Sequence, residues 1–308
     1  MDSATVRIGW IGLGTMGLEM ARNLQKHRES TSQTSITVFN RTPSKCEHIK
    51  KHGARVATSP AEVAEQSDLV FLSLVNDDAV KEIIIQLLES AASSATTTPL
   101  IIADTTTVHP STPNWTLDQI SNKSTQRPVK FCQTPVWGAP PAAKSASLVF
   151  VASGSNNELL ASIAVPAFAR TTIYCDSPVR AAKFKIMGNF MIASIIESLG
   201  EALAVADEAG IGRELYLEFV QNVLPVPPVL GYAQKMVGDG GEASKHQVGF
   251  NIKGGMKDVG YAIDVAKSVG MRLPVAELAY EHLQWVLDNG DEGWDWSSLA
   301  FALRKNKL

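Results

Sequence analysis

The chain has 308 residues, of which 45% are hydrophobic and 19% are charged, so its composition is that of an ordinary globular protein and its length suggests two domains. Its net charge of -3 gives no general attraction to nucleic acid or to an acidic membrane surface. Three scattered cysteines fit a reducing compartment better than a disulfide framework.

No leader pattern opens the sequence, and no apolar run reaches the ~20 residues that a membrane span needs. We therefore expect a cytoplasmic protein with neither nucleic acid nor a membrane among its partners. The final residues Asn306, Lys307 and Leu308 come close to the peroxisomal signal Ser-Lys-Leu, so peroxisomal import is kept as an alternative.

The first part of the chain alternates apolar segments of strand type with segments of helical periodicity. Met16, Met20 and Leu24, for example, recur at the spacing of one helix face. The strands are expected at 5–14, 35–40, 54–57, 68–74, 99–104, 129–136 and 146–154. The helices are expected at 15–27, 43–53, 59–66 and 77–90. This alternation predicts a mainly parallel, doubly wound sheet.

Two local patterns add detail to this reading. Asn76 or Asp77 is placed to cap the helix at 77–90. The low-complexity segment 90–98 that follows predicts a surface loop.

The sequence changes character near residue 178. A helical pattern runs from Ala181 to Ala209, longer than a usual globular helix and nearly all apolar in its first half, which predicts a buried helix between domains. Every later segment is also of helical type: 213–223, 227–238, 255–269, 274–289 and 296–305. We therefore predict an α/β domain at 1–178, and a long interdomain helix followed by an all-helical domain at 179–308.

A glycine-rich turn follows the first strand and opens the first helix. The residues Gly12, Leu13, Gly14, Thr15, Met16 and Gly17 fit the pattern G-x-G-x-x-G. In this context the three glycines permit a tight turn, the approach of a pyrophosphate and close helix packing, and the helix N-terminus attracts phosphate. The pattern predicts a Rossmann domain that binds a dinucleotide through these six residues. The alternative is a glycine turn in an α/β protein without a cofactor.

The end of the second strand indicates which dinucleotide is bound. Enzymes that use NAD usually place a carboxylate there for the ribose 2′-hydroxyl. This chain has Asn40, Arg41 and Thr42 instead, and an amide, a guanidinium and a hydroxyl suit a 2′-phosphate. We expect NADP(H) as the cofactor. The alternative is an arginine that only caps the loop.

At this point the sequence resembles the β-hydroxyacid dehydrogenase family, which includes 3-hydroxyisobutyrate dehydrogenases and glyoxylate/succinic semialdehyde reductases and shares its cofactor domain with 6-phosphogluconate dehydrogenase. The resemblance covers essentially the whole chain. It rests on six segments in the family's order: "IGWIGLGTMGLEMARNL", "NRTPSKC", "DTTTVHP", "KFKIMGN", "FNIKGGMKD" and "DWSSL".

The resemblance implies that Lys185 and Asn189 are the catalytic pair. Lys185 would act as general acid/base at a carbonyl or hydroxyl oxygen, and Asn189, four residues later, would share its helix face. The family spacing K-x-x-x-N selects Lys185 over Lys183. The alternative is that Lys185 extends to solvent from a buried helix.

The resemblance also implies further site residues and an assembly. The additional cofactor contacts would be Val75, Thr107 and Lys257. The substrate contacts would be Thr106, Trp137, Gly138, Phe250 and Asp258. The family commonly associates through its helical domain, so the resemblance implies a homodimer or a larger homo-oligomer.

One segment departs from the family pattern. Where the family has P-V-S-G-G, with a serine that holds the substrate carboxylate, this chain has Trp137 in place of the serine. Pro140 and Pro141 then remove two N–H donors. Arg180 is a candidate replacement anchor. The substrate is therefore either the small acid of the family or a bulkier, less polar carbonyl compound.

The resulting hypothesis is an NADPH-dependent oxidoreductase that reduces a small aldehyde or ketone, or oxidises a 3-hydroxy acid, with Lys185 as general acid/base. Two alternatives are an imine reductase-like enzyme on the same fold and a catalytically inactive NADPH-binding module. No metal site is expected, because the spacing of Cys46, His48 and His52 divides these residues between helix faces.

Overall fold

The computed structural model describes residues 2–305, so the expectation of peroxisomal import rests on residues outside the described part. The chain divides into two compact units, Met1–Lys185 and Ile186–Leu308, which are called here the first unit and the helical unit. The sequence placed a boundary after residue 178, at the start of the long helix. The division found in the structure lies inside that helix.

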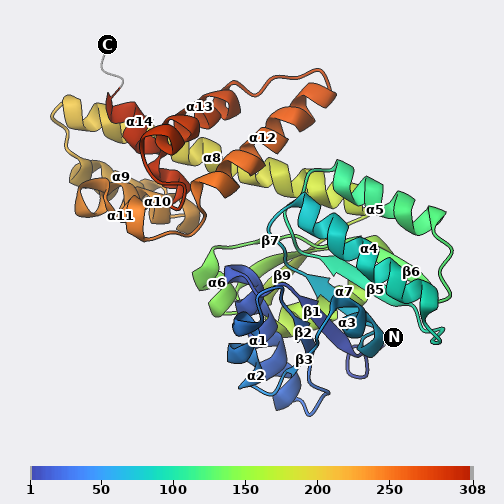
Figure 1. The fold of residues 1–308 in the computed structure, drawn as a ribbon. Helices are drawn as coiled ribbons and strands as arrows, with labels where there is room; N and C mark the ends of the chain where they lie inside the picture. The colour runs from blue at the N-terminus through green and yellow to red at the C-terminus, as the bar shows by residue number, and fades with distance from the viewer. Residues whose placement is uncertain (1, 306–308) are drawn as a thin grey trace. The chain divides into compact units, whose positions relative to one another are not determined.

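The first unit is built on a six-stranded parallel sheet of order β3-β2-β1-β4-β5-β6 (Figure 1). This is the strand order of a Rossmann fold, which confirms the predicted fold class. The strands are β1 Ile8–Ile11, β2 Thr37–Phe39, β3 Arg55–Val56, β4 Leu69–Leu72, β5 Leu100–Asp104 and β6 Val129–Gln133. The helices between them are α1 Thr15–Ser30, η1 Pro43–Lys45, α2 Cys46–Lys50, α3 Pro60–Gln66, α4 Asp77–Ser93 and α5 Ser111–Asn122.

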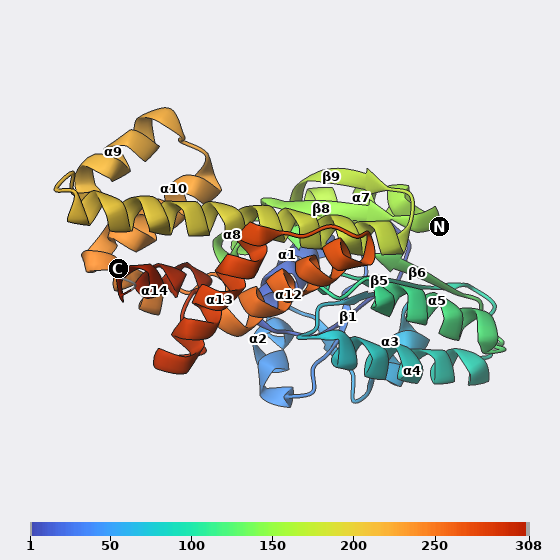
Figure 2. The ribbon, with the colours of Figure 1, turned by 90° about the horizontal axis from the view of Figure 1, so that it is seen from above.

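The sheet is covered on both faces. Side chains of α3, α4 and α5 pack on one face in a core that includes Val70, Ile84 and Ile102. Side chains of α1 and α2 pack on the other face with Trp10 and Phe71, whose rings stack at 5.1 Å. Figure 2 shows α3, α4 and α5 together along one side of the sheet. The central strands β1 and β4 are buried along their whole length and contain no polar side chain, because both of their faces are covered.

A second, three-stranded sheet has the order β7-β8-β9. Its strands are β7 Val136–Trp137, β8 Leu148–Ser153 and β9 Ala169–Cys175, and its helices are α6 Pro140–Lys144, η2 Gly154–Asn156 and α7 Asn157–Ala167. The strand predicted at 129–136 is therefore two strands in two sheets. Pro135 separates them, since proline lacks the N–H that a continuous strand would donate. Neither α7 nor β9 was predicted.

The start of α4 agrees with the sequence prediction, and its end differs from it. The side chain of Asn76 accepts a hydrogen bond from the N–H of Ala79, so Asn76 rather than Asp77 caps α4. At its other end α4 continues to Ser93, so the first residues of the predicted loop 90–98 are helical. The apolar face of α4 explains this extension, because Ala91 is buried against the sheet.

The helical unit is entered through α8, Pro178–Glu208. It continues with α9 Arg213–Val223, α10 Pro227–Val237, η3 Gly238–Gly241, α11 Ala243–His246, α12 Ile252–Ser268, α13 Pro274–Asn289, η4 Trp296–Leu299 and α14 Ala300–Lys305. The prediction of helices throughout is confirmed. Helix α12 begins three residues earlier than predicted because the side chain of Asn251 caps it at the N–H of Gly254.

By length and composition alone, α8 is apolar enough to cross a membrane, which the sequence analysis did not expect. This is weak support for a membrane span, because a core helix passes the same test. Ile196, Leu199 and Leu203 of α8 are buried in the core of the helical unit. The apolar character of α8 is therefore explained by packing.

Candidate functional site

The glycine turn lies where strand β1 ends. Gly12 has φ +98°, and a Cβ at this position would overlap the carbonyl oxygen of Ser73. A Cβ on Gly17 would overlap the carbonyl oxygen of Gly12. A Cβ on Gly14 would have nothing within 4 Å. Two glycines are thus required for packing, and the middle one borders open space at the N-terminus of α1, which is where a pyrophosphate would bind.

The amide of Asn40 stabilises this turn. Its Oδ1 accepts a hydrogen bond from the N–H of Leu13 at 2.8 Å, and its Nδ2 donates to the carbonyl oxygen of Thr42 at 3.0 Å. Both Asn40 and Leu13 were predicted to contact the cofactor. In the structure the amide of Asn40 and the N–H of Leu13 bond to each other, so these two groups shape the binding loop from inside the protein.

Arg41 and Thr42 follow β2 and are exposed. Within residues 2–305 the guanidinium of Arg41 makes no hydrogen bond or ion pair. Thr42 precedes the short helix η1, which begins at Pro43. Arg41 is therefore a solvated cation on the loop after β2, close in sequence to the residue that braces the glycine turn.

A threonine ties the loops after β4 and β5 together. The hydroxyl of Thr106 accepts a hydrogen bond from the N–H of Leu74 at 2.9 Å, and Thr106 is buried. The next residue on the β4 loop, Val75, is 73% exposed. Thr107, expected near the nicotinamide, follows Thr106 on the β5 loop and is half-buried. Thr106 was predicted to bind substrate, and its hydroxyl also holds the loop that presents Val75.

The carboxyl group of Asp104 lies beneath this tie. Its Oδ1 accepts from the N–H of Thr106 at 2.9 Å, while its Oδ2 has no hydrogen-bond partner among the described residues. Asp104 is fully buried, and burial raises the pKa of its carboxyl to about 7 against the opposing effect of the bonds from Thr106. The sequence analysis gave Asp104 no role, although its position at the end of an apolar strand is a signal for one.

Lys185 lies in α8 beside two aromatic rings. Its Nζ is 5.0 Å from the ring centroid of Trp137, within cation–π range. The ring of Trp137 meets that of Phe184 edge to face at 4.9 Å. Lys185 is 7% exposed, whereas Lys183 is exposed. Burial of Lys185 disfavours the alternative in which its ammonium extends to solvent.

Asn189 lies one turn further along α8, on the same helix face as Lys185. Its Nδ2 donates to Oδ2 of Asp258 at 2.6 Å. Asp258 is fully buried, and its Oδ1 is 3.0 Å from Nζ of Lys257. The structure therefore brings Asn189, Lys257 and Asp258 together, and an ammonium beside Asp258 offsets the cost of burying its charge.

Asp295 positions the segment that precedes this group. Its Oδ2 accepts from the N–H groups of Gly249 and Phe250 and from Nζ of Lys235. The ring of Phe250 packs edge to face on Trp296 at 5.1 Å. Phe250 was predicted to contact the substrate, whereas Asp295 was given no role. The signal in the sequence is an aspartate directly before Trp296, because the side chain of Asp295 caps this short helix at the N–H of Ser297.

Two residues considered as substrate contacts, Arg180 in α8 and Gly138 after β7, have structural roles. Arg180, considered as a carboxylate anchor, forms an exposed ion pair with Asp176 at 2.7 Å. Gly138, predicted to contact the substrate, has φ +136°, and a Cβ there would overlap the side chains of Leu148 and Ala142. The chain needs glycine at this position to turn from β7 into α6.

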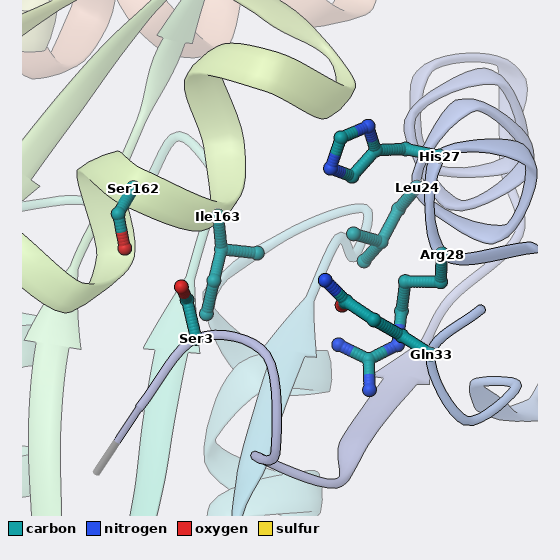
Figure 3. A pocket seen from close by; sticks show the side chains of 7 residues that line it. All are labelled: Ser3, Leu24, His27, Arg28, Gln33, Ser162 and Ile163. Carbon is teal, nitrogen blue, oxygen red and sulfur yellow. The ribbon is translucent and has the colours of Figure 1, made fainter. Parts of the chain in front are cut away.

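A small hollow lies at the opposite end of the sheet (Figure 3). Its volume is about 40 Å³, and it is lined by Ser3, Leu24, His27, Arg28, Gln33, Ser162 and Ile163. Arg28 at its wall donates to the carbonyl oxygens of Val6 and Thr34, which is a structural role. A wider groove of about 870 Å³ beside it also borders the starts of β5 and β6. Both lie at the amino ends of the strands, whereas Gly12 follows the carboxyl end of β1, so neither hollow is the cofactor site.

Two family models match the chain. Residues 7–172 match the NAD binding domain of 6-phosphogluconate dehydrogenase, and residues 180–303 match the NAD-binding domain of NADP-dependent 3-hydroxyisobutyrate dehydrogenase. The first match alone spans more than half of the chain. The chain belongs to the β-hydroxyacid dehydrogenase family. It is therefore an NAD(P)-dependent oxidoreductase, and the glycine turn with open space at Gly14 fits a nicotinamide dinucleotide.

Family members with curated names match over nearly their full length. An NADH-dependent oxidoreductase of Aspergillus ustus is 28% identical over 94% of this chain and 96% of its own. Glyoxylate/succinic semialdehyde reductase 1 of Arabidopsis thaliana is 26% identical over 97% of this chain and 99% of its own. The first of these relatives is named for its cofactor and the second for its substrates.

Solved structures share the fold. Mycobacterium tuberculosis 3-hydroxyisobutyrate dehydrogenase with L-serine has a TM-score of 0.80 at 20% identity, covering 97% of this chain and 99% of that one. A Streptomyces aurantiacus imine reductase has a TM-score of 0.59 at 19% identity, covering 97% and 100%. The agreement confirms the arrangement of a Rossmann domain followed by a helical domain.

The glycine turn generates a prediction that separates packing from binding. Gly14→Ala should change the free energy of unfolding by no more than about 0.5 kcal/mol, because the new methyl group meets no protein atom. It should weaken dinucleotide binding by about 10-fold or more, because the methyl group enters the space of the pyrophosphate. Thermal unfolding and fluorescence titration with NADPH and NADH measure the two effects. Gly17→Ala is the matched control and should destabilise the fold by about 1–3 kcal/mol. Unchanged affinity in Gly14→Ala would contradict the assignment.

The buried carboxyl group predicts a pH dependence of stability. The pKa of Asp104 is about 7 in the folded protein, against an ordinary value of 3.8. The protonated side chain therefore contributes to the stability of the fold below pH 3.8, and this contribution is lost as the pH rises to about 7. Asp104→Asn mimics the protonated acid and lacks this loss. Its stability relative to the native protein should rise by about 1.4 kcal/mol per pH unit between pH 4 and 7 and then level off. Unfolding midpoints across pH test this, with Asp118→Asn on the exposed face of α5 as control. A difference that does not change with pH would refute it.

Proposed function

We propose that this protein is an NADPH-dependent reductase of a small aldehyde or ketone, or in the reverse direction an NADP-dependent hydroxyacid dehydrogenase. The observation that carries the proposal is the buried Lys185, one helical turn before Asn189 on the same face of α8. A buried lysine side chain suits a general acid, because the site around it can hold a carbonyl oxygen within reach of its proton and away from bulk water.

The chain's own residues would carry the proton chemistry. The nicotinamide cofactor, when bound, supplies the hydride to the carbonyl carbon and is oxidised as the carbonyl is reduced. The ammonium of Lys185 donates its proton to the carbonyl oxygen as the C=O π bond opens, so an alcohol forms, and Lys185 regains a proton from solvent. The Nδ2 of Asn189 donates a hydrogen bond to Asp258, which holds the amide in place. This amide would orient the carbonyl oxygen of the substrate.

Arg41 supports the choice of NADPH. Its guanidinium is solvated on the loop after β2, where a Rossmann domain places the adenosine ribose, and Asn40 leaves the loop without a carboxylate that would repel a phosphate. A guanidinium binds phosphate with paired charge-assisted hydrogen bonds. This supports NADPH over NADH for this chain, although the Aspergillus relative is named as NADH-dependent.

The cofactor preference can be measured directly. The native protein should bind NADPH more tightly than NADH by at least ~10-fold, about 1.4 kcal/mol. Arg41→Ala should weaken NADPH and leave NADH nearly unchanged in fluorescence titrations, because only the 2′-phosphate is lost as a partner. Lys26→Ala, on the exposed side of α1, removes an equal charge and should change neither affinity. Equal affinities of the native protein for the two cofactors would exclude the preference.

Lys185→Met tests the mechanism. It keeps the apolar stem and removes the proton donor, so turnover of the best carbonyl in a screen of aldehydes, ketones and keto acids should fall by about 10²–10⁴-fold. NADPH affinity should barely change, and the fold should survive because an apolar group replaces a buried charge. The matched variant Lys183→Met should have a much smaller effect on turnover. If Lys183→Met removes activity and Lys185→Met does not, the assignment is wrong.

Two other functions remain candidates. The first is imine reduction, because imine reductase structures share the fold. Comparing the turnover of a cyclic imine with that of a carbonyl compound separates the two reactions. The second candidate is an inactive NADPH-binding module. The observation in its favour is that Trp137 replaces the serine of the family pattern. NADPH binding without turnover of any carbonyl or imine would support it.

We also propose a homo-oligomer formed through the helical unit. Leu215, Phe219 and Val223 lie at the spacing of one face of α9 and are all exposed. An apolar stripe of this kind marks an interaction surface. Light scattering of the purified protein would measure the assembly.

A further inference from the structure

We infer that Trp137 makes this active site select neutral carbonyl compounds that carry an apolar substituent, and that its ring positions the Lys185 ammonium. This inference rests on the proposed function and specifies its substrate class. It is carried by one arrangement inside the first unit, in which Trp137, Phe184 and Lys185 contact one another.

The distance between the indole and the ammonium places the ring beside any substrate. A carbonyl oxygen that takes a proton from Nζ must lie within about 3 Å of it. The ring centroid of Trp137 is 5.0 Å from the same Nζ. With the carbonyl oxygen on the side of Nζ that faces the ring, one substituent of the carbonyl carbon would lie against the indole. An aromatic ring offers such a group apolar contact and no positive charge.

The segment around Trp137 has little that would bind a carboxylate. Residues 135–141 read Pro-Val-Trp-Gly-Ala-Pro-Pro, which contains no charged side chain. Its three prolines have no N–H to donate. Among the other cations of α8, Arg180 is paired with Asp176 and Lys183 is exposed. A carboxylate held there would lose its water without gaining full replacement bonds, which is costly.

The two aromatic residues are not only packing residues. Phe184 is 41% exposed and Trp137 is half-buried, so each keeps accessible surface. The edge-to-face contact with Phe184 fixes the orientation of the indole, and the indole face attracts the ammonium. Trp137 is thus a positioning residue for Lys185 as well as a contact for the substrate.

The test uses carbonyl pairs that differ only in a methyl or a carboxylate group: butanal against 4-oxobutanoate, and acetophenone against phenylglyoxylate. With NADPH, the native protein should show a kcat/KM at least about 10-fold higher for the methyl member of each pair that it reduces. Trp137→Ser should reduce this ratio by about 10-fold or more. Trp137→Phe keeps an aromatic face and should retain most of the ratio.

A pH profile separates positioning from packing. Loss of the cation–π contact disfavours the ammonium by roughly 3- to 30-fold, so the alkaline decline of kcat/KM should move to lower pH in Trp137→Ser and less in Trp137→Phe. Trp115→Ser is the control. Trp115 lies in α5 and also has a lysine, Lys81 of α4, over its ring, but neither residue belongs to the proposed site. This variant should change neither the ratio nor the profile.

The outcomes are distinct. A native preference for the carboxylate members, or a Trp137→Ser variant with an unchanged ratio and profile, overturns this inference and leaves the reductase intact. Failure to reduce any carbonyl with either cofactor overturns the proposed function together with it. A ratio that favours the methyl members and falls in Trp137→Ser, with the shifted profile, supports the inference.

Discussion

The close approach of the first turn to strand β4 is the constraint on which the rest of the first unit depends. Gly12 and Gly17 leave no room for a side chain, because the carbonyl of Ser73 and the turn's own backbone occupy that space. This contact brings the N-terminus of α1 to the carboxyl edge of the sheet. The positive end of the helix then points at open space beside Gly14, and a phosphate-binding surface results from backbone geometry alone.

The loops along that edge are held by buried polar groups rather than by apolar packing. Asn40 braces the glycine turn, and Thr106 joins the β4 and β5 loops above Asp104. Buried hydrogen bonds are directional, so they fix loop positions more sharply than apolar contacts of the same size. Within residues 2–305 one oxygen of the Asp104 carboxyl group has no hydrogen-bond partner, and burial raises the pKa of this group, so this edge of the sheet is less stable than an apolar one would be.

The sequence predicted what depends on periodicity and on glycine. The alternation of strands and helices, the Rossmann turn and the all-helical second half follow from local patterns, and the structure has them. The sequence did not predict which partners the polar side chains bond to. Asn40 and Arg180 were plausible ligand groups by type, yet Asn40 bonds to Leu13 and Arg180 to Asp176. Strand β9 was missed because most of its residues are exposed, which removes the apolar signal.

Under the proposed function, reaction chemistry and substrate choice would be carried by different residues of this chain. Proton transfer needs an ammonium at a set distance from the carbonyl oxygen, and Lys185 of helix α8 would supply it. Trp137 lies on β7, in the smaller sheet, and reaches the same ammonium from another part of the chain. Under the proposed function, a change on β7 would therefore alter which substituent fits and how the charge is held, while the lysine would keep its place on α8. Residue 137 would then be a position where substrate choice can diverge without loss of the reaction.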